Sequence, residues 1–307
     1  MRYAIGVDIG GTSTKLGLVS EQGEIAARRV IALRPDASFA DFADELGDGV
    51  AALLGNGIPV AGIGVGIPGY AHPETGAIVK PVPNCPPLAG GSLAEAFSKR
   101  FAIPTKVGND GVCAAMGERD FGAGRAFRRY CVLTLGTGIG GAVVIDGVVI
   151  DGPYGLPPEI GAICLDPSRT DLPSNVPGTF EFLASAASLV RRYQALAPEA
   201  DVANAKELFT RAESGDALAR QVVQEGGRWI AQAVGMMSNM LNLDAVILGG
   251  GLSHAGSQLL DCVTPFLDGF YWAPFGRPPQ LLLAATGNDA GIVGAAALGL
   301  QFSGVHV

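Results

Sequence analysis

The chain has 307 residues, of which 48% are hydrophobic and 16% charged, and its formal net charge is −8. This apolar content excludes a disordered chain, and the sequence lacks the repeats of a coiled coil or of collagen. The acidic balance argues against a nucleic-acid partner, which usually requires a basic face. The length permits about two domains with a sizeable core.

Elements in the first part of the chain follow from turn signals and apolar spacing. Turn residues separate the first three strands, which predicts an antiparallel meander. Ser92 with Glu95 three positions later is typical of a helix start. The elements expected here are strands at residues 3–8, 15–20, 24–32, 60–66 and 105–107, and helices at 39–54, 92–100 and 110–119.

The second part repeats the pattern of strand, glycine-rich turn, strand, turn and strand, which indicates a weak internal duplication. A loop rich in Pro, Gly and Ser spans residues 152–177. The elements expected are strands at 130–135, 141–146, 148–151, 245–248 and 281–284, and helices at 180–195, 205–213, 216–241 and 290–300. We therefore expect an α/β protein of two similar halves with a cleft between them.

Cysteine usage and the N-terminus indicate the compartment. The five cysteines are dispersed and form no C-x-x-C pair, so a reducing cytoplasm fits best. Asp8 comes too early for a signal peptide, and the most apolar window, residues 131–150, is rich in glycine and contains Asp146. We expect a cytoplasmic protein with no membrane partner.

A glycine-rich turn directly follows the first strand. Gly10 and Gly11 let the backbone approach a ligand closely, and successive N–H groups there suit an anion. Thr12 follows the glycines, and Asp8 and Lys15 flank the turn. Since a carboxylate repels bare phosphate, Asp8 indicates a bridging Mg²⁺. The alternative is an ordinary hairpin turn with solvated polar residues.

A second such turn, formed by Gly136, Thr137 and Gly138, is neither a Walker loop nor a Rossmann fingerprint, because a strand follows it. Two similar turns opening two similar halves would hold a triphosphate from both sides. A third glycine run ends a later strand, which suits the nucleoside end of that ligand. It consists of Gly249, Gly250 and Gly251. We attribute much of the high glycine content to these turns.

Together these motifs resemble the ROK family of sugar kinases (repressor, open reading frame, kinase) within the actin/hexokinase/Hsp70 superfamily. The resemblance spans Asp8 to about Leu300, through residues 8–15, 66–69, 83–84, 109–110, 136–141, 159–161, 246–251 and 289–295. It implies two ribonuclease-H-like (actin-like ATPase) domains with an interdomain cleft. The smaller domain would comprise residues 1–115 with helix 289–303 folded back onto it, and the larger one residues 116–288.

The resemblance also implies an activity and its residues. The chain would be an ATP- and Mg²⁺-dependent kinase that phosphorylates a hydroxyl, the primary 6-hydroxyl, of a hexose such as glucose or of an amino sugar. Asp110 would be the general base, Asp8 would hold Mg²⁺ through water, and Lys15 and the three glycine turns would bind ATP. The sugar-binding positions carried over are Gly69, Asn84, Asn109, Asp110, Glu159 and Glu181.

Simpler interpretations exist for several of these residues. Asn109 and Asp110 also suit a helix N-cap. Asn84 also suits a turn after Pro83, and Glu181 an acidic position in the first turn of a helix.

The chain departs from the family pattern at two places. Ala162 stands where the family usually has a histidine that contacts both sugar and zinc. The usual cysteine ligands are missing from residues 174–181, and Cys164 alone cannot form a tetrahedral site. We therefore expect no structural zinc, and an acceptor site with more space and one polar partner fewer.

Two other activities remain open, and one partner is expected. A sugar- or nucleotide-sensing protein with weak or no kinase activity would also explain the departures. A kinase that uses polyphosphate as donor is a third possibility. Because kinases of this family commonly dimerise, we expect a homodimer; an aromatic stripe at residues 266–275 suits an interface as well as a core.

Overall fold

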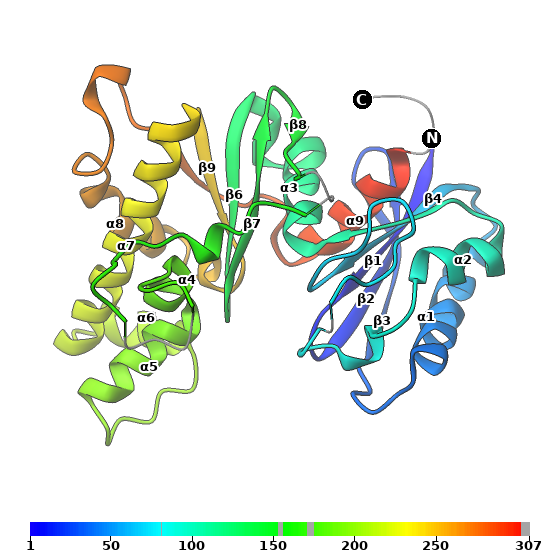
Figure 1. Cartoon of the computed structure of the whole chain (residues 1–307), viewed down its shortest axis with the longest axis horizontal. Helices are drawn as coiled ribbons and strands as arrows, with labels where there is room; N and C mark the ends of the chain where they lie inside the picture. Colours follow the sequence, from blue (N-terminus) through cyan, green and yellow to red (C-terminus); the bar gives the residue numbers. More distant parts are fainter. Residues whose placement is uncertain (81, 153–155, 171–174, 302–307) are drawn as a thin grey trace. The chain divides into compact units, whose positions relative to one another are not determined.

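The computed structural model describes residues 1–80, 82–152, 156–170 and 175–301 (Figure 1). The chain divides into two compact units. Unit 1 comprises Met1–Arg125, Val149–Pro158 and Ala285–Val307, and unit 2 comprises Ala126–Val148 and Glu159–Ala284. Each contains one five-stranded mixed sheet with helices, which confirms the predicted α/β class. The domain boundaries given from the sequence stay a prediction.

The sheet of unit 1 has the order β3-β2-β1-β4-β5. Strands β1, β2 and β3 pair antiparallel, as the predicted meander requires, while β4 and β5 run parallel to β1. The strands are β1 (Tyr3–Ile9), β2 (Ser13–Ser20), β3 (Ile25–Ala32), β4 (Val60–Ile67) and β5 (Thr105–Asn109).

Helices cover both faces of this sheet. Because side chains of a strand alternate between faces, Ile5, Val7 and Ile9 join one buried cluster with α1 and α2. Ala4 lies on the other face, in a cluster with α9, against which α3 packs. The helices are α1 (Phe39–Leu54), α2 (Leu93–Phe101), α3 (Asp110–Phe121) and α9 (Ala290–Leu300), with 3-10 turns η1 (Pro86–Leu88), η2 (Ala123–Ala126) and η6 (Gly287–Asp289).

Glycines let α9 lie unusually close to the sheet and to α3. A Cβ on Gly6 or Gly64 would overlap a carbonyl oxygen of α9. A Cβ on Gly294 would overlap the carbonyl oxygen of Cys113 in α3. Residues 292–299 are all buried, as is typical of a helix that is apolar on every side. Part of the glycine excess therefore serves packing, which the attribution to ligand-binding turns missed.

Unit 2 repeats the topology of unit 1 in the order β10-β9-β6-β7-β8. Strand β6 pairs antiparallel with β7 on one side and parallel with β9 on the other, as β1 does with β2 and β4. The internal duplication is therefore visible in the strand order. The strands are β6 (Arg129–Leu135), β7 (Ile139–Ile145), β8 (Val148–Val149), β9 (Ala245–Gly249) and β10 (Gln280–Leu283).

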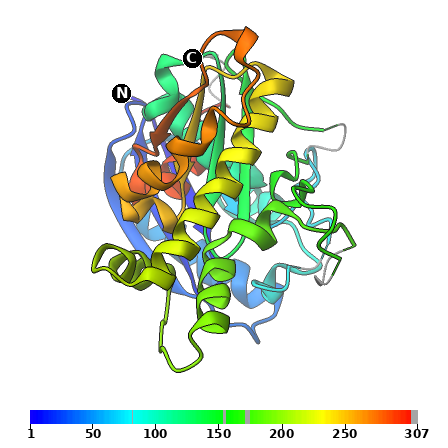
Figure 2. The same cartoon turned by 90° about the vertical axis from the view of Figure 1, so that its left-hand side faces the viewer.

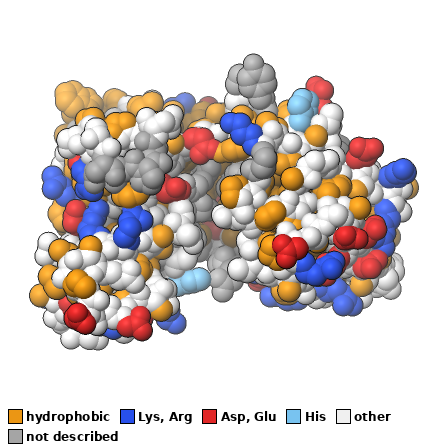
Figure 3. Space-filling view, turned by 60° about the horizontal axis from the view of Figure 1, so that its bottom comes forward, with side chains coloured by type: hydrophobic (Ala, Val, Ile, Leu, Met, Phe, Trp, Pro, Cys, Tyr) orange, Lys and Arg blue, Asp and Glu red, His pale blue; other side chains and the backbone are white. Residues whose placement is uncertain are grey.

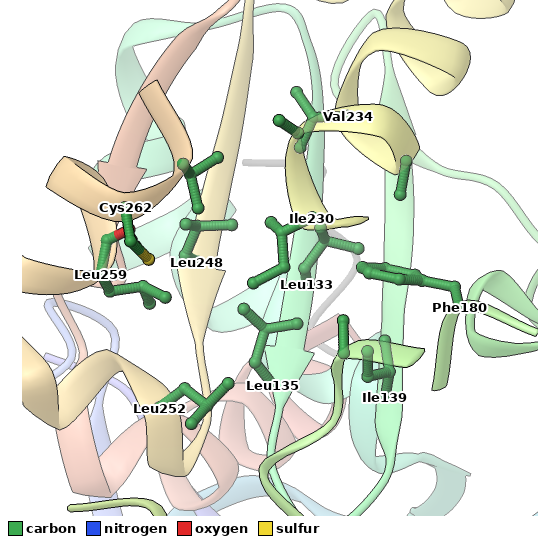
Figure 4. Close-up of a cluster of buried hydrophobic side chains, with 14 of the residues drawn as sticks. Leu133, Leu135, Ile139, Phe180, Ile230, Val234, Leu248, Leu252, Leu259 and Cys262 are labelled. Atoms are coloured by element: carbon green, nitrogen blue, oxygen red, sulfur yellow. The ribbon is translucent and has the colours of Figure 1, made fainter. Parts of the chain in front are cut away.

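The long helix α7 runs across strands of this sheet (Figure 2). Its Ile230 and Val234 join a buried cluster with Leu133 of β6, Leu248 of β9 and Phe180 (Figure 4). The helices are α4 (Phe180–Ala184), α5 (Ala186–Leu196), α6 (Ala205–Glu213), α7 (Ala217–Leu241) and α8 (Ser257–Leu267), with 3-10 turns η3 (Ile160–Ala162), η4 (Gly251–Ala255) and η5 (Ala273–Phe275).

One expectation for unit 2 was wrong. The helix predicted at 180–195 is two helices, because Ser185 has an extended backbone and its side chain caps α5 by accepting from the Ser188 N–H. A helix after the third glycine run was expected without bounds, and α8 contains Pro265, a residue that is unfavourable in a helix interior. Parts of the loop at 152–177 and the end of the helix predicted at 289–303 lie outside the described residues.

The surface carries both signs of charge. On the face shown in Figure 3, acidic and basic side chains are interspersed with apolar and uncharged ones. Among the helices of the described residues, none is long and apolar enough to cross a membrane.

The close contact of α9 with α3 predicts the effect of Gly294→Ala. Overpacking costs about 1–3 kcal/mol, and the gain in helix propensity is about 1 kcal/mol. Because a backbone carbonyl cannot move without shifting α3, we expect the free energy of unfolding to fall by about 2 kcal/mol. Urea unfolding measures it. Gly55→Ala is the control, because the new Cβ there would lie 3.5 Å from the carbonyl oxygen of Ala52, an ordinary contact distance. Equal stability of both variants would contradict the close contact of Gly294.

Candidate active site

The turn between β1 and β2 offers unpaired backbone N–H groups. The N–H of Gly10 donates to the carbonyl of Ser13 at 3.0 Å and closes the turn. The next two N–H groups, of Gly11 and Thr12, have no hydrogen-bond partner among the described residues, and both residues are exposed. Exposed neighbouring N–H groups of this kind suit an anion such as a phosphate.

Asp8 lies beside this turn on the face of the sheet that α9 covers. Lys15 is its direct partner on β2, and Gly291 in the first turn of α9 lies against its carboxylate, where a Cβ would overlap. Burial raises the pKa of Asp8, and the charge of Lys15 opposes this rise. A carboxylate in such surroundings favours a nearby cation. The sequence did not single out Gly291 as a site residue, although Gly291 lies in the family motif at 289–295.

Asn109 caps helix α3 and is anchored to a neighbouring loop. Its Oδ1 accepts from the N–H groups of Gly111 at 2.9 Å and Val112 at 3.4 Å. Its Nδ2 donates to the carbonyl oxygen of Gly69 at 3.0 Å. The N-cap interpretation therefore holds for Asn109. The side chain of Asn109 is also hydrogen-bonded to the carboxyl group of Asp110, so it holds the first residue of α3 in place.

Asp110, the first residue of α3, lies near Asp8. The residue as a whole is exposed at the surface. Protein atoms nevertheless surround its carboxyl group and displace much of the water there. This burial, together with the charge of Asp8, raises the pKa of Asp110 to about 6, although the Gly111 N–H donates to its Oδ1 at 2.8 Å. A carboxylate with such a pKa suits proton transfer near neutral pH.

Asn84 lies next to the first glycine turn. A Cβ placed on Gly11 would be 3.4 Å from the carbonyl oxygen of Asn84 and 3.5 Å from its Cβ. The residue is exposed, and its side chain has no hydrogen-bond partner among the described residues. Unit 1 therefore brings together most of its predicted site residues: Asp8, Gly10, Gly11, Thr12, Lys15, Gly69, Asn84, Asn109 and Asp110.

The turn between β6 and β7 repeats the arrangement of the first. The N–H of Gly136 donates to the carbonyl oxygen of Gly138 at 2.9 Å, and the Ile139 N–H donates to Oε2 of Glu181 at 2.8 Å. Within the described residues, the N–H groups of Thr137 and Gly138 have no such partner. This turn therefore offers two N–H groups to an anion, as the first turn does.

Glu181 is a predicted sugar-binding residue, and its carboxylate also stabilises this turn. One of its oxygens is used by Ile139, which the sequence did not indicate, and its charge reaches Glu159. Burial, and to a lesser extent this neighbouring charge, raises the pKa of Glu159. Glu159 directly precedes η3, and a Cβ on Gly161 in that turn would lie 3.4 Å from the Cβ of Glu181.

The third glycine run lies beside the second turn. Gly249 ends β9, and Gly250 has a positive φ of 76°, which favours glycine. A Cβ on Gly250 would be 2.7 Å from the backbone nitrogen of Leu135, the residue before Gly136. With Gly251 beginning η4, unit 2 places two predicted nucleotide-binding segments next to each other.

Comparison with known proteins identifies the family. Residues 4–301 match the ROK family over nearly the whole chain. The chain belongs to the ROK family.

Several of the relatives that the chain matches over nearly its whole length are sugar kinases. The chain is 31% identical to a glucokinase of Thermotoga maritima over 96% of each chain, and 28% identical to an N-acetylmannosamine kinase of Escherichia coli over 96% of this chain and 98% of that one. A ROK glucokinase of Streptomyces griseus, solved with glucose and AMPPNP, superposes with a TM-score of 0.82 at 29% identity, covering 97% and 99%. The predicted glucokinase-like carbohydrate kinase of the ROK family is thereby confirmed.

The absence of the zinc site that is usual in this family stays a prediction. No three His, Cys, Asp or Glu side chains gather into a metal-binding group within residues 1–80, 82–152, 156–170 and 175–301. Cys164 is half-buried and pairs by backbone with Thr179. Residues 171–174 lie outside the description, and their sequence, Asp-Leu-Pro-Ser, contains no cysteine or histidine.

The unusual pKa of Asp110 predicts the pH dependence of this ROK protein. Only the ionised carboxylate can accept a proton, so turnover should be lost as the pH falls through about 6. The measurement is kcat at saturating substrates between pH 4.5 and 8.5. A profile that is flat down to pH 4.5 would contradict the assignment.

We also predict that the purified protein holds no structural zinc. Elemental analysis of protein purified without chelators should find far less than one zinc per chain. One zinc per chain that survives dialysis would contradict this prediction.

Proposed function

We propose that this ROK protein is an ATP-dependent kinase that transfers the γ-phosphoryl group of ATP to the primary 6-hydroxyl of a hexose, with glucose the first candidate. The observation that carries the proposal is the pair of neighbouring carboxylates, Asp8 and Asp110, beside a turn with unpaired N–H groups. The full-length likeness to glucokinases supports the choice of glucose.

Asp110 acts as the general base in this proposal. Its ionised carboxylate accepts the proton of the sugar hydroxyl as that oxygen attacks the γ-phosphorus. The new P–O bond forms while the bond to the bridging oxygen of ADP breaks, and ADP leaves. The proton then passes from Asp110 to water. The Asn109 side chain donates to the carbonyl oxygen of Gly69 and is also hydrogen-bonded to Asp110, so it would hold the base in place beside the sugar.

The carboxylate of Asp8 suits Mg²⁺. It is closely packed, its pKa is raised by burial, and it accepts no hydrogen bond among the described residues, so a cation would balance its charge. Oxygen ligands are those that Mg²⁺ prefers, and a bound Mg²⁺ would neutralise charge on the ATP phosphates. Lys15 lies opposite Asp8 and would add positive charge there. In each unit, the two unpaired N–H groups of the glycine turn, those of Gly11 and Thr12 or of Thr137 and Gly138, would donate to phosphate oxygens.

Amino sugars are the second class of acceptor, because the likeness extends to an N-acetylmannosamine kinase. Glu159 and Glu181 would accept hydrogen bonds from sugar hydroxyls through oxygens that the turn does not use. Ala162 contributes no polar group beside them. We further propose a cytoplasmic homodimer; of the aromatic stripe, Trp272 and Phe275 are 59% and 49% exposed.

The test is ADP release with Mg²⁺-ATP across glucose, mannose, N-acetylglucosamine and N-acetylmannosamine. We expect sugar-dependent release with glucose preferred, and glucose 6-phosphate as the product identified by mass spectrometry and NMR. No release with any sugar, but measurable sugar or nucleotide binding, would instead indicate a sensing protein. Activity with polyphosphate and none with ATP would overturn the assigned donor.

Asp110→Asn tests the base directly. We expect kcat to fall by about 10²–10⁴-fold while ATP binding persists, because the amide cannot accept the proton. A raised pKa means that ionisation of Asp110 opposes folding, so above pH 6 the variant should be at least as stable as the wild type. Asp36→Asn, at an exposed loop position, is the matched control. Near wild-type turnover of Asp110→Asn would exclude Asp110 as the base.

A further inference from the structure

Glu118 is a buried carboxylate on helix α3 that the sequence did not mark as functional. Its residue surface is only 1% exposed. Oε2 accepts from the N–H groups of Ala123 at 2.7 Å and Ala285 at 3.2 Å, and Oε1 accepts from the N–H of Thr286 at 2.9 Å and from its hydroxyl at 2.5 Å. All four partners are donors, as an ionised carboxylate requires.

The partners of Glu118 lie beside two of the four points at which the chain crosses between the units. The chain first leaves unit 1 after Arg125, shortly after Ala123, and it returns for the last time at Ala285. One side chain therefore fixes the first outgoing and the last returning segment inside unit 1. The outgoing segment is tightly fitted, because a Cβ on Gly122 would overlap the carboxylate of Glu118.

The same side chain joins the helix that carries Asp110 to the segment that leads into α9, the helix packed against Asp8. Helix α3 begins at Asp110 and includes Glu118 in its later turns. The returning segment runs from Thr286 into α9, whose first turn places Gly291 against Asp8. A change at Glu118 would therefore reach Asp110 through α3 and Asp8 through α9.

The hydrogen-bond donors to Glu118 indicate that its carboxylate fixes the path of the chain and does not simply fill space in the core. A buried carboxylate is costly unless its charge is balanced, and a basic side chain usually provides that balance. Glu118 instead uses three backbone N–H groups and one hydroxyl, all in the first outgoing and the last returning segment. Backbone donors fix the path of the chain, which a flexible lysine or arginine would not do.

We propose that Glu118 is a positioning residue, which clamps the first outgoing and the last returning segment and thereby holds α3, which begins at Asp110, and α9, which packs against Asp8, in their reactive placement. The catalytic part of this inference rests on the proposed kinase function. None of the residues that bond to Glu118 is a predicted sugar- or nucleotide-binding residue.

Glu118→Gln is the principal test, because it keeps the size of the side chain but replaces one acceptor oxygen by a donor that would face other donors. We expect kcat per folded molecule to fall at least tenfold, while KM for the sugar changes less than threefold, since Glu118 bonds to none of the sugar-binding side chains. Glu95→Gln, an exposed residue on α2, is the matched control. A kcat within twofold of wild type would overturn the proposal.

Thr286 provides a milder pair of variants in case Glu118→Gln folds poorly. Thr286→Val removes the hydroxyl donor at nearly constant volume, whereas Thr286→Ser retains it. We expect Thr286→Val to lower kcat at least threefold and Thr286→Ser to restore it to within twofold of wild type. Equal kcat values for these two variants would contradict a role of this hydrogen bond.

Hydrogen exchange tests the clamp without relying on activity. The amides of Ala123, Ala285 and Thr286 should exchange at least tenfold faster in Glu118→Gln than in the wild type. Unchanged exchange would overturn the clamp even if turnover fell. A wild type that phosphorylates no sugar would overturn the proposed function and the catalytic role of Glu118, while the exchange rates would still decide whether the clamp exists.

Discussion

The close approach of α9 to the first sheet and to α3 is the constraint on which the candidate site of unit 1 depends. Side chains are absent from both surfaces at Gly6, Gly64 and Gly294, so backbone packs on backbone. This contact brings the first turn of α9 onto the carboxylate of Asp8 and fixes α3, which begins at Asp110. A side chain larger than hydrogen at these positions would displace a whole helix, because the atoms it would meet belong to the backbone.

The two units contain the same kind of glycine turn, but different side chains lie beside it. In each, a hairpin follows a buried strand, the first glycine N–H closes the turn, and the next two N–H groups have no partner among the described residues. The first turn is accompanied by Asp8, whose burial raises its pKa, whereas the second is braced by Glu181 through Ile139. The repeated strand order explains why the same turn arises twice.

Much of the candidate site was predictable because turns and strand ends are local features. Asp8 with its glycine turn, the Gly136 turn and the start of α3 at Asp110 are short-range patterns, and the structure places them as expected. Longer-range relations were not predictable. Three contacts join residues that are far apart in the sequence. Glu181 accepts a hydrogen bond from the Ile139 N–H, Gly291 packs against the carboxylate of Asp8, and Glu118 accepts a hydrogen bond from the Thr286 N–H. The split of the helix predicted at 180–195 depends on the backbone of Ser185 alone.

The sequence by itself determined the family, the order of most strands and helices, and the residue types that suit phosphate and sugar. It could do so because apolar periodicity and glycine turns depend on neighbouring residues only. The tertiary structure decided which residues have a shifted pKa or an unusual set of hydrogen-bond partners. Asp110 acquires its raised pKa from burial and from Asp8, and Glu118 acquires three of its four donors from Ala285 and Thr286, which are far away in the sequence. Such effects depend on the density of atoms around a group, and folding alone sets that density.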